Sequence, residues 1–175
     1  MGKLDTRFSV VRYGNVINSK GSVIPYFKSL LKEGKTLTIT DERMTRFLIT
    51  LEKAVEFVLK SFERMQGGEI FVPKIPSMKV TDIALALSGG KPYEVIGIRA
   101  GEKLHEAMIT KEDSLRTIEF DDHFIIKPTI SFTSSINYDN LKDAKKIEDG
   151  FEYTSDKNSW WLTKDEFLKL TGNDS

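Results

Sequence analysis

The sequence predicts an α/β fold in which at least some strands pair in parallel. Short apolar or β-branched runs alternate with amphipathic segments of helical period along most of the 175 residues, an order typical of α/β proteins. Glycines and polar residues separate the runs, and no internal repeat or low-complexity tract occurs. With 39% hydrophobic residues, the chain can bury a core, and its length suits one domain or a portion of a larger one.

The first elements follow from local pattern. Phe8 to Tyr13 is an apolar, β-branched run that predicts a buried strand, and the Asn, Ser and Gly residues of 15–22 predict a loop. Apolar residues then recur at helical spacing from Val23 until Gly34, a glycine that predicts the helix end. Two further strands are predicted at 37–40 and 46–50.

A longer amphipathic helix is predicted next. Thr50 can cap its start, and Gly67-Gly68 ends it. Such a stripe of apolar residues is ordinarily the side of a helix that packs against a core. The stripe consists of Leu51, Val55, Val58, Leu59 and Phe62.

The second half continues the alternation. The pattern predicts strands at 69–73, 93–98 and within 120–127, helices from Thr81 or Asp82 to Gly89-Gly90 and over 101–109, and a polar, irregular stretch over 133–159. Thr163 and Glu166 have the spacing of a capping box, which predicts a last short helix through Leu170.

Composition excludes several classes of function. Lys+Arg 26 balances Asp+Glu 26, so no net field draws the chain to nucleic acid or to an anionic membrane. No apolar stretch approaches the roughly 20 residues of a membrane span, and residues 1–7 lack the apolar core of a signal peptide. The absence of cysteine is compatible with the cytoplasm, so a cytoplasmic protein without nucleic-acid or membrane partners is expected.

The end of the first predicted strand is a candidate binding position. Ligands of open α/β sheets bind beyond the carboxyl ends of the strands, and Asn15 lies just past such an end. Its amide can donate and accept hydrogen bonds, as recognition of a sugar requires. The alternative is a plain Asn-Ser-Gly surface turn.

Two later segments carry arginines suited to phosphate. Arg99 leaves a predicted strand, Gly101 permits a tight turn, and Glu102 is expected at a helix start. Arg46 follows Thr40 in a strand-rich segment, and a guanidinium can hold two phosphate oxygens in a fork. The alternatives are a Glu102 that stabilises the helix dipole, and an Arg46 that pairs with surface carboxylates.

These motifs occur in an order that resembles a known family. The runs 11–16, 21–27 and 98–106, together with the ending Phe151-Glu152-Tyr153 through Trp160-Trp161-Leu162, are similar to the C-terminal half of the extended short-chain dehydrogenase/reductases. Within that superfamily these sequence motifs most resemble those of the inverting UDP-N-acetylglucosamine 4,6-dehydratases, which belong to the polysaccharide biosynthesis proteins. The resemblance implies the last part of a Rossmann-type sheet and the smaller substrate-binding domain. It assigns 1–22 to the end of the cofactor domain, 23–132 to the substrate domain and 133–175 to a polar extension with a short final helix.

The resemblance also implies roles for single residues. It places Asn15 against the nucleotide-sugar, Thr40 against the uracil ring, Arg46 and Arg99 against phosphate, and Glu102 against the ribose hydroxyls. The start of the helix after Ser22 would line the same pocket through Val23, Ile24, Pro25, Tyr26 and Phe27. The nicotinamide side of NADP would be contacted by Val16, Ile17, Asn18, Ser19 and Lys20.

The catalytic parts of such an enzyme do not occur in these residues. There is no glycine-rich phosphate loop, and the one Tyr-x-x-x-Lys match, Tyr138 to Lys142, lies in the polar tail and is interpreted as coincidence. No catalytic residue is therefore assigned, and His105 and His123 lack the spacing of metal ligands.

The resulting expectation is the substrate-binding part of an NADP-dependent UDP-N-acetylglucosamine 4,6-dehydratase that serves pseudaminic acid, capsule or flagellar glycan synthesis. The isolated chain is expected to be inactive. When complete it would be a homo-oligomer, or it would associate with a missing N-terminal half. The alternatives are part of a UDP-amino-sugar epimerase and a non-catalytic nucleotide-sugar-binding module.

Overall fold

The computed structural model describes residues 6–129, 138 and 141–172. Their contacts divide the chain into two compact units, each assembled from three stretches. The unit that we call the sheet unit contains the chain up to Tyr13, Glu52–Lys74 and Met108–Tyr153. The other, the three-helix unit, contains Gly14–Leu51, Ile75–Ala107 and the chain from Thr154. Helices and strands are mixed in both, so the predicted α/β class is confirmed.

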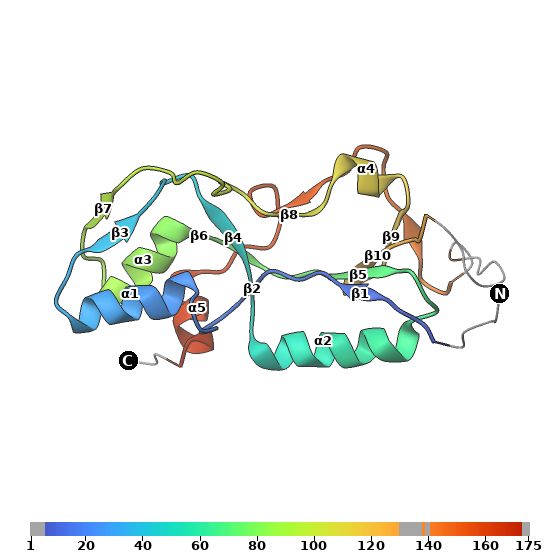
Figure 1. The fold of residues 1–175 in the computed structure, drawn as a ribbon, viewed down its shortest axis with the longest axis horizontal. Helices are drawn as coiled ribbons and strands as arrows, with labels where there is room; N and C mark the ends of the chain where they lie inside the picture. Colours follow the sequence, from blue (N-terminus) through green and yellow to red (C-terminus); the bar gives the residue numbers. More distant parts are fainter. Residues whose placement is uncertain (1–5, 130–137, 139–140, 173–175) are drawn as a thin grey trace. The chain divides into compact units, whose positions relative to one another are not determined.

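The sheet unit is built on a five-stranded sheet in the order β1-β5-β10-β9-β11 (Figure 1). β1 (Val10–Val11) pairs in parallel with β5 (Ile70–Pro73), and β10 (His123–Ile126) is antiparallel to β5. β9 (Thr117–Glu119) and β11 (Lys145–Lys146) continue the sheet in antiparallel pairs. Among the described residues β1 pairs on one side only, so it forms one edge of this sheet.

One helix covers the apolar side of this sheet. Phe57 on α2 (Leu51–Arg64) packs in one buried cluster with residues of the sheet, which are Phe71, Ile118 and Ile125. The short helix α4 (Lys111–Ser114) begins at Thr110, whose hydroxyl and Asp113 form a reciprocal capping box. α4 was not among the predicted helices, although its Thr-x-x-Asp spacing is typical of a helix start.

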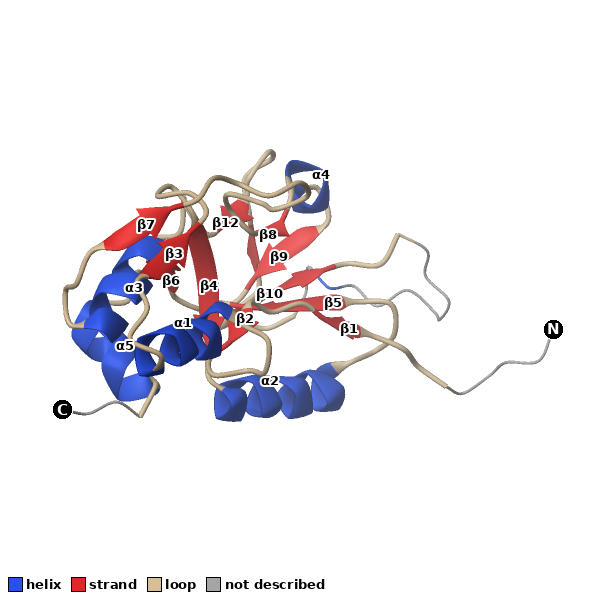
Figure 2. Ribbon diagram, turned by 60° about the vertical axis from the view of Figure 1, so that its left-hand side comes forward, coloured by secondary structure: helices blue, strands red, loops and turns tan. Residues whose placement is uncertain are grey.

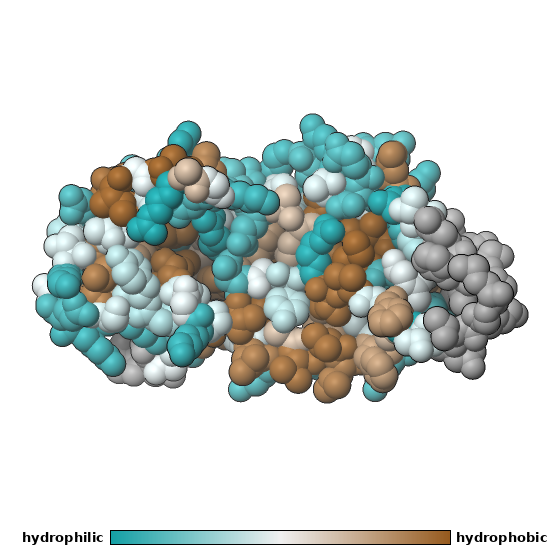
Figure 3. Space-filling view, in the orientation of Figure 1, coloured by the Kyte–Doolittle hydropathy of each residue, from teal (hydrophilic) through white to brown (hydrophobic). Residues whose placement is uncertain are grey.

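The apolar face predicted for α2 does not pack against the core of the structure. The buried side of this helix is Ala54, Phe57 and Ser61 instead. At 3.6 residues per turn, the predicted stripe lies about a third of a turn away from that side. Its members, which form the brown band along α2 in Figure 3, are exposed by 40–71%: Leu51, Val55, Val58, Leu59 and Phe62.

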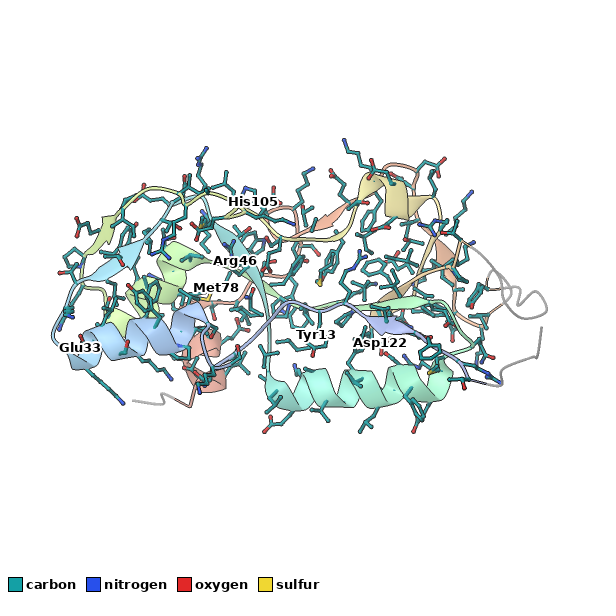
Figure 4. All side chains as sticks on the ribbon, viewed as in Figure 1. Tyr13, Glu33, Arg46, Met78, His105 and Asp122 are labelled. Atoms are coloured by element: carbon teal, nitrogen blue, oxygen red, sulfur yellow. The ribbon has the colours of Figure 1, made fainter. Side chains whose placement is uncertain are left out.

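The three-helix unit combines short strand pairs with three helices (Figure 2). β2 (Asn15–Val16) is parallel to β4 (Thr45–Ile49), β4 is antiparallel to β6 (Ser77–Lys79), and β3 (Leu37–Ile39) is parallel to β7 (Tyr93–Val95). The predicted loop at 15–22 therefore begins with a strand. Arg46 and Met78, both labelled in Figure 4, are register partners across β4 and β6.

The helices of this unit share one core. They are α1 (Val23–Lys32), α3 (Val80–Ser88) and α5 (Lys164–Leu170). Ile24, Phe27, Ile83 and Phe167 are each at most 2% exposed in this core. The capping box predicted for the last helix is confirmed, since Thr163 and Glu166 bond reciprocally. Gly34 and Gly89 have positive φ angles of 68° and 67° at the helix ends, as predicted for glycine stops.

The helix predicted over 101–109 is wrong. The structure has turns there, followed by the strand β8 (Ala107–Ile109). The carbonyl oxygen of Leu104 accepts from the backbone N–H of Thr45 at 3.0 Å, and that of Glu106 accepts from Ser155 at 2.8 Å. In a helix these two carbonyl oxygens would accept hydrogen bonds from N–H groups of the same helix, so the long-range bonds replace the helical ones.

Two further observations complete the fold. The strand β12 (Tyr153–Thr154) lies in the stretch predicted to be irregular, of which residues 133–137 and 139–140 lie outside the described part. Within the described residues, no helix has the length and apolar character needed to cross a bilayer.

Candidate functional site

A pocket of about 690 Å³ in the three-helix unit gathers most of the predicted substrate residues. It is bounded by the start of α1, the end of β3 and the segment 96–102. Of the ten residues predicted for the substrate, eight line it: Val23, Pro25, Tyr26, Phe27, Thr40, Arg46, Arg99 and Glu102. Other lining residues, such as Thr38, Met44 and Ile96, were not predicted, because no local sequence pattern distinguishes them from their neighbours in the chain.

The N-terminus of α1 forms one side of this pocket. Ser22 is its N-cap, but the Ser22 side chain makes no capping bond, and no acidic residue occupies the first turn. The Ser22 Oγ is buried without a hydrogen-bond partner among the described residues. The positive end of the helix dipole and its unpaired N–H groups are therefore not neutralised by the helix itself, which favours an anion.

The turn from Arg99 to Glu102 forms another side. Glu102 accepts from the backbone N–H of Arg99 and from the hydroxyl of Thr40, both at 3.1 Å. Gly101 has a φ of 81°, which explains a glycine in this turn. Glu102 lies in a turn and not at a helix start, so the helix-dipole alternative does not apply.

The Arg99 guanidinium is available to a ligand. The residue is exposed, and no hydrogen bond or ion pair of its side chain is present within the described part of the chain. Arg99 therefore contributes a guanidinium without an ion-pair partner among the described residues, in the pocket that the Glu102 carboxylate also lines.

Arg46 differs from Arg99 because the protein already uses its donors. Its Nη1 donates to the carbonyl oxygens of Thr45 at 2.7 Å and Leu104 at 3.0 Å, and its Nη2 donates to that of Lys103 at 3.0 Å. Its Nε lies 3.9 Å from Glu106. Arg46 thus holds the segment that leads away from Glu102, and its predicted contact with a diphosphate stays a prediction.

Asn15 does not line the pocket but belongs to a hydrogen-bonded cluster in the same unit. One terminal atom of its amide lies 2.9 and 3.1 Å from the two carboxylate oxygens of Glu106, and because an ionised carboxylate only accepts, that atom is assigned as the amide nitrogen. Glu106 also accepts from the backbone N–H of Phe47 at 3.1 Å. Burial raises the pKa of Glu106, against the opposing effect of the Phe47 N–H. Glu106 was not among the predicted site residues.

The residues predicted for the cofactor are Val16, at the end of β2, and the turn that follows it. Ile17 is 6% exposed in the core. The Asn18 side chain bonds the Thr171 carbonyl oxygen at 3.4 Å and Lys28 at 3.3 Å, while Lys20 is exposed. Ile24, predicted for the substrate, is likewise a core residue at 2% exposure and does not line the pocket.

A second cavity, of about 560 Å³, lies in the sheet unit. Tyr138 lines it and donates to Glu69 at 2.9 Å. Burial and this bond raise the pKa of Tyr138, which opposes the tyrosinate that a catalytic Tyr/Lys pair needs. Eight of the ten residues predicted for the substrate line the first pocket, so that pocket is the candidate site.

Comparisons with known proteins show the family of the chain. The family model of polysaccharide biosynthesis proteins matches residues 1–128. The UDP-N-acetylglucosamine 4,6-dehydratase (inverting) of Campylobacter jejuni serotype O:2 is 53% identical over 97% of this chain and 52% of its own length. A UDP-glucose 4-epimerase of Rickettsia akari is 38% identical over 95% of this chain and 49% of its own. The X-ray structure of Pen from Bacillus thuringiensis superposes with a TM-score of 0.82 at 33% identity, over 98% of this chain and 51% of that one. The chain therefore spans about half the length of the relatives that it matches.

Proposed function

Since the chain belongs to the polysaccharide biosynthesis protein family, we propose that its three-helix unit binds the UDP-sugar of a UDP-N-acetylglucosamine 4,6-dehydratase. The observation that carries the proposal is the pairing, in one pocket, of a free arginine and an uncapped helix N-terminus. A diphosphate offers the negative charge that both groups favour.

Each part of the pocket has a task in this proposal. Arg99 and the first turn of α1 would bind the diphosphate, and Glu102 would accept from the ribose hydroxyls. Thr40 holds Glu102 by its hydrogen bond, so the carboxylate is oriented before the ligand arrives. This preorganisation lowers the entropy that binding must overcome.

NADP is the cofactor that we propose for the complete protein. The fit of the five predicted residues is partial, because Ile17 belongs to the core and Asn18 is already bonded within the unit. Contacts from this chain would come from the backbone of Val16 and from Ser19 and Lys20. When bound, NADP would supply the hydride acceptor and donor of the internal redox cycle that the family resemblance implies. This chain would hold the sugar in place for that cycle.

Ligand binding by the purified chain tests the proposal. Isothermal titration is expected to show binding of both UDP and UDP-N-acetylglucosamine. Product analysis is expected to show no 4-keto-6-deoxy sugar, with or without NADP, because no catalytic residue is assigned to this chain. A folded chain without affinity for UDP would overturn the pocket assignment. Detection of product would overturn the inactivity and return Tyr138 and Lys142 to consideration.

The epimerase relatives favour a second candidate reaction at the same pocket. Adding the complementary half of the Campylobacter jejuni dehydratase in trans discriminates the candidates, since the two chains are 53% identical. Dehydratase product supports the proposal, and a 4-epimer supports an epimerase. UDP-sugar binding without any turnover supports a non-catalytic module. Synthesis of pseudaminic acid or of a capsule or flagellar glycan, and a cytoplasmic location, stay predictions.

We also propose that the exposed stripe of α2 and the edge of β1 associate with a polypeptide equivalent to the half of the relatives that this chain does not span. The stripe lies on the flank of α2, where a neighbouring helix of an α/β layer packs. Val58→Asp and Phe62→Asp are each expected to abolish co-elution with the complementary half. Leu115→Asp, at a leucine that is 68% exposed outside the stripe, is the matched control. If the stripe variants instead dissociate a homodimer and the half never binds, the stripe is a homo-oligomer interface.

A further inference from the structure

His123 lies in a buried aromatic environment in the sheet unit. It is the first residue of β10, and its side chain is 5% exposed. Its ring stacks on that of Phe120, with 4.6 Å between the ring centres and 7° between the planes. The ring of Phe71, on β5, lies 6.3 Å away, and that of Phe57, on α2, meets it in a T-shaped contact at 6.3 Å. The imidazole is therefore part of the packing of α2 on the sheet.

One nitrogen of this ring is bonded and the other is not. Nδ1 lies 2.6 Å from the Oδ1 of Asp122, which is labelled in Figure 4. Because an ionised carboxylate only accepts, the single proton of the neutral ring is assigned to Nδ1. Arg64 Nη1 also approaches Nδ1, at 3.4 Å, but a guanidinium cannot accept this proton and Asp122 lies closer. Nε2 is buried without a hydrogen-bond partner among the described residues, although His123 lines the cavity of the sheet unit.

A second proton does not fit this environment. A doubly protonated imidazole donates from both nitrogens, so its Nε2–H group would be buried without an acceptor. Burial lowers the pKa of His123, against the opposing effect of the Asp122 carboxylate, and the charges of Arg64 and Lys74 lower it further. The other titratable groups that line the cavity with His123 are Arg64, Glu69, Asp121, Asp122, Tyr138, Lys142 and Asp143.

We infer that His123 is a pH-sensitive switch in the packing of α2 on the sheet, because the neutral ring fits this site and the doubly protonated ring does not. In the unfolded chain the ring is in water and takes its second proton near pH 6.5, the ordinary value of about 6.5 for histidine. Below that pH the unfolded state therefore binds more protons than the folded state, and the stability of the sheet unit falls. Carboxylates with a lowered pKa, such as Glu69 and Asp122, lose their contribution only in stronger acid, below about pH 4.5.

Nitrogen NMR of the His123 ring in the full chain tests the protonation state directly. The ring signals are identified by their loss in His123→Phe. In the folded chain Nδ1 should carry the proton and Nε2 should carry none, both at pH 7.5 and at pH 6, where most of the unfolded rings are doubly protonated. A proton on Nε2 in the folded chain at pH 6.5 or above would overturn the inference, whether or not His123→Phe folds.

Urea unfolding of the full chain tests the consequence for stability. The unfolding equilibrium constant, counted from the folded and unfolded amide signals of β10, should rise by about three- to tenfold between pH 7.5 and pH 5.5. His123→Phe keeps an aromatic ring among the phenylalanines but cannot titrate, so this rise should disappear. His105→Gln is the matched control, because it removes the other histidine of the chain, which lies in the three-helix unit, and it should keep the rise. No rise in the unmodified chain, a rise that persists in His123→Phe, or its loss in His105→Gln would each overturn the switch.

Discussion

Replacing Arg99 by alanine is expected to weaken UDP binding by about ten- to a hundredfold. A charge-assisted hydrogen bond to phosphate contributes about 1.5–3 kcal/mol, and Arg99 makes no competing bond within the described residues. The melting temperature of the chain should not change, because the guanidinium supports no other contact there. In a completed enzyme the affinity for NADP should fall far less than that for the UDP-sugar. Titration calorimetry and a thermal melt measure these quantities.

Arg43→Ala is the matched control for this result. Arg43 lies in the same unit, but its guanidinium pairs with Asp41 at 2.7 Å and is 70% exposed. The hydrogen bond from the Arg43 side chain lowers the pKa of Asp41 to about 2. Such exposed ion pairs nevertheless contribute little to stability. The control variant should bind UDP as the unmodified chain does. Equal loss in both variants would show a general electrostatic effect, and no loss in Arg99→Ala would remove Arg99 from the site.

Elements whose ends are set by local chemistry could be predicted from the sequence. The helix α5 begins where Thr163 and Glu166 bond each other, and α1 ends before Gly34, which takes a positive φ. Each signal lies within a few residues of the helix start or helix end that it sets. The turn at Arg99 to Glu102 was predictable for the same reason, because Gly101 permits it.

Features that depend on distant parts of the chain could not be predicted. The segment 101–109 has helix-forming residues, but Thr45, Arg46 and Ser155 bond its carbonyl groups. The apolar stripe of α2 was identified correctly as a stripe, but periodicity does not show what covers it. Glu106 is far from Asn15 in sequence, so no local pattern pairs them.

Gly14→Ala is expected to destabilise the three-helix unit by about 3 kcal/mol, within the range of forced overpacking. A Cβ at this position would lie 2.4 Å from the Phe47 Cβ and 2.6 Å from the Phe47 carbonyl oxygen. Neither atom is the far end of a flexible side chain, so β2 must move away from β4. Urea unfolding followed by circular dichroism measures the loss.

The same displacement should reach Glu106 through Asn15, which follows Gly14 directly. Asn15 and Phe47 share Glu106 as their acceptor, so separating β2 from β4 pulls the two donors apart. Gly34→Ala is the control: its φ is 68° and its Cβ would meet nothing within 4 Å, so only the cost of a left-handed alanine, about 1 kcal/mol, is expected. If Gly14→Ala loses no more stability than this control, then the close approach of β2 to β4 does not set the position of Asn15. If it loses stability as expected, then Gly14 is required because it lets β2, which contains Asn15, lie against β4, whose Phe47 N–H donates to Glu106.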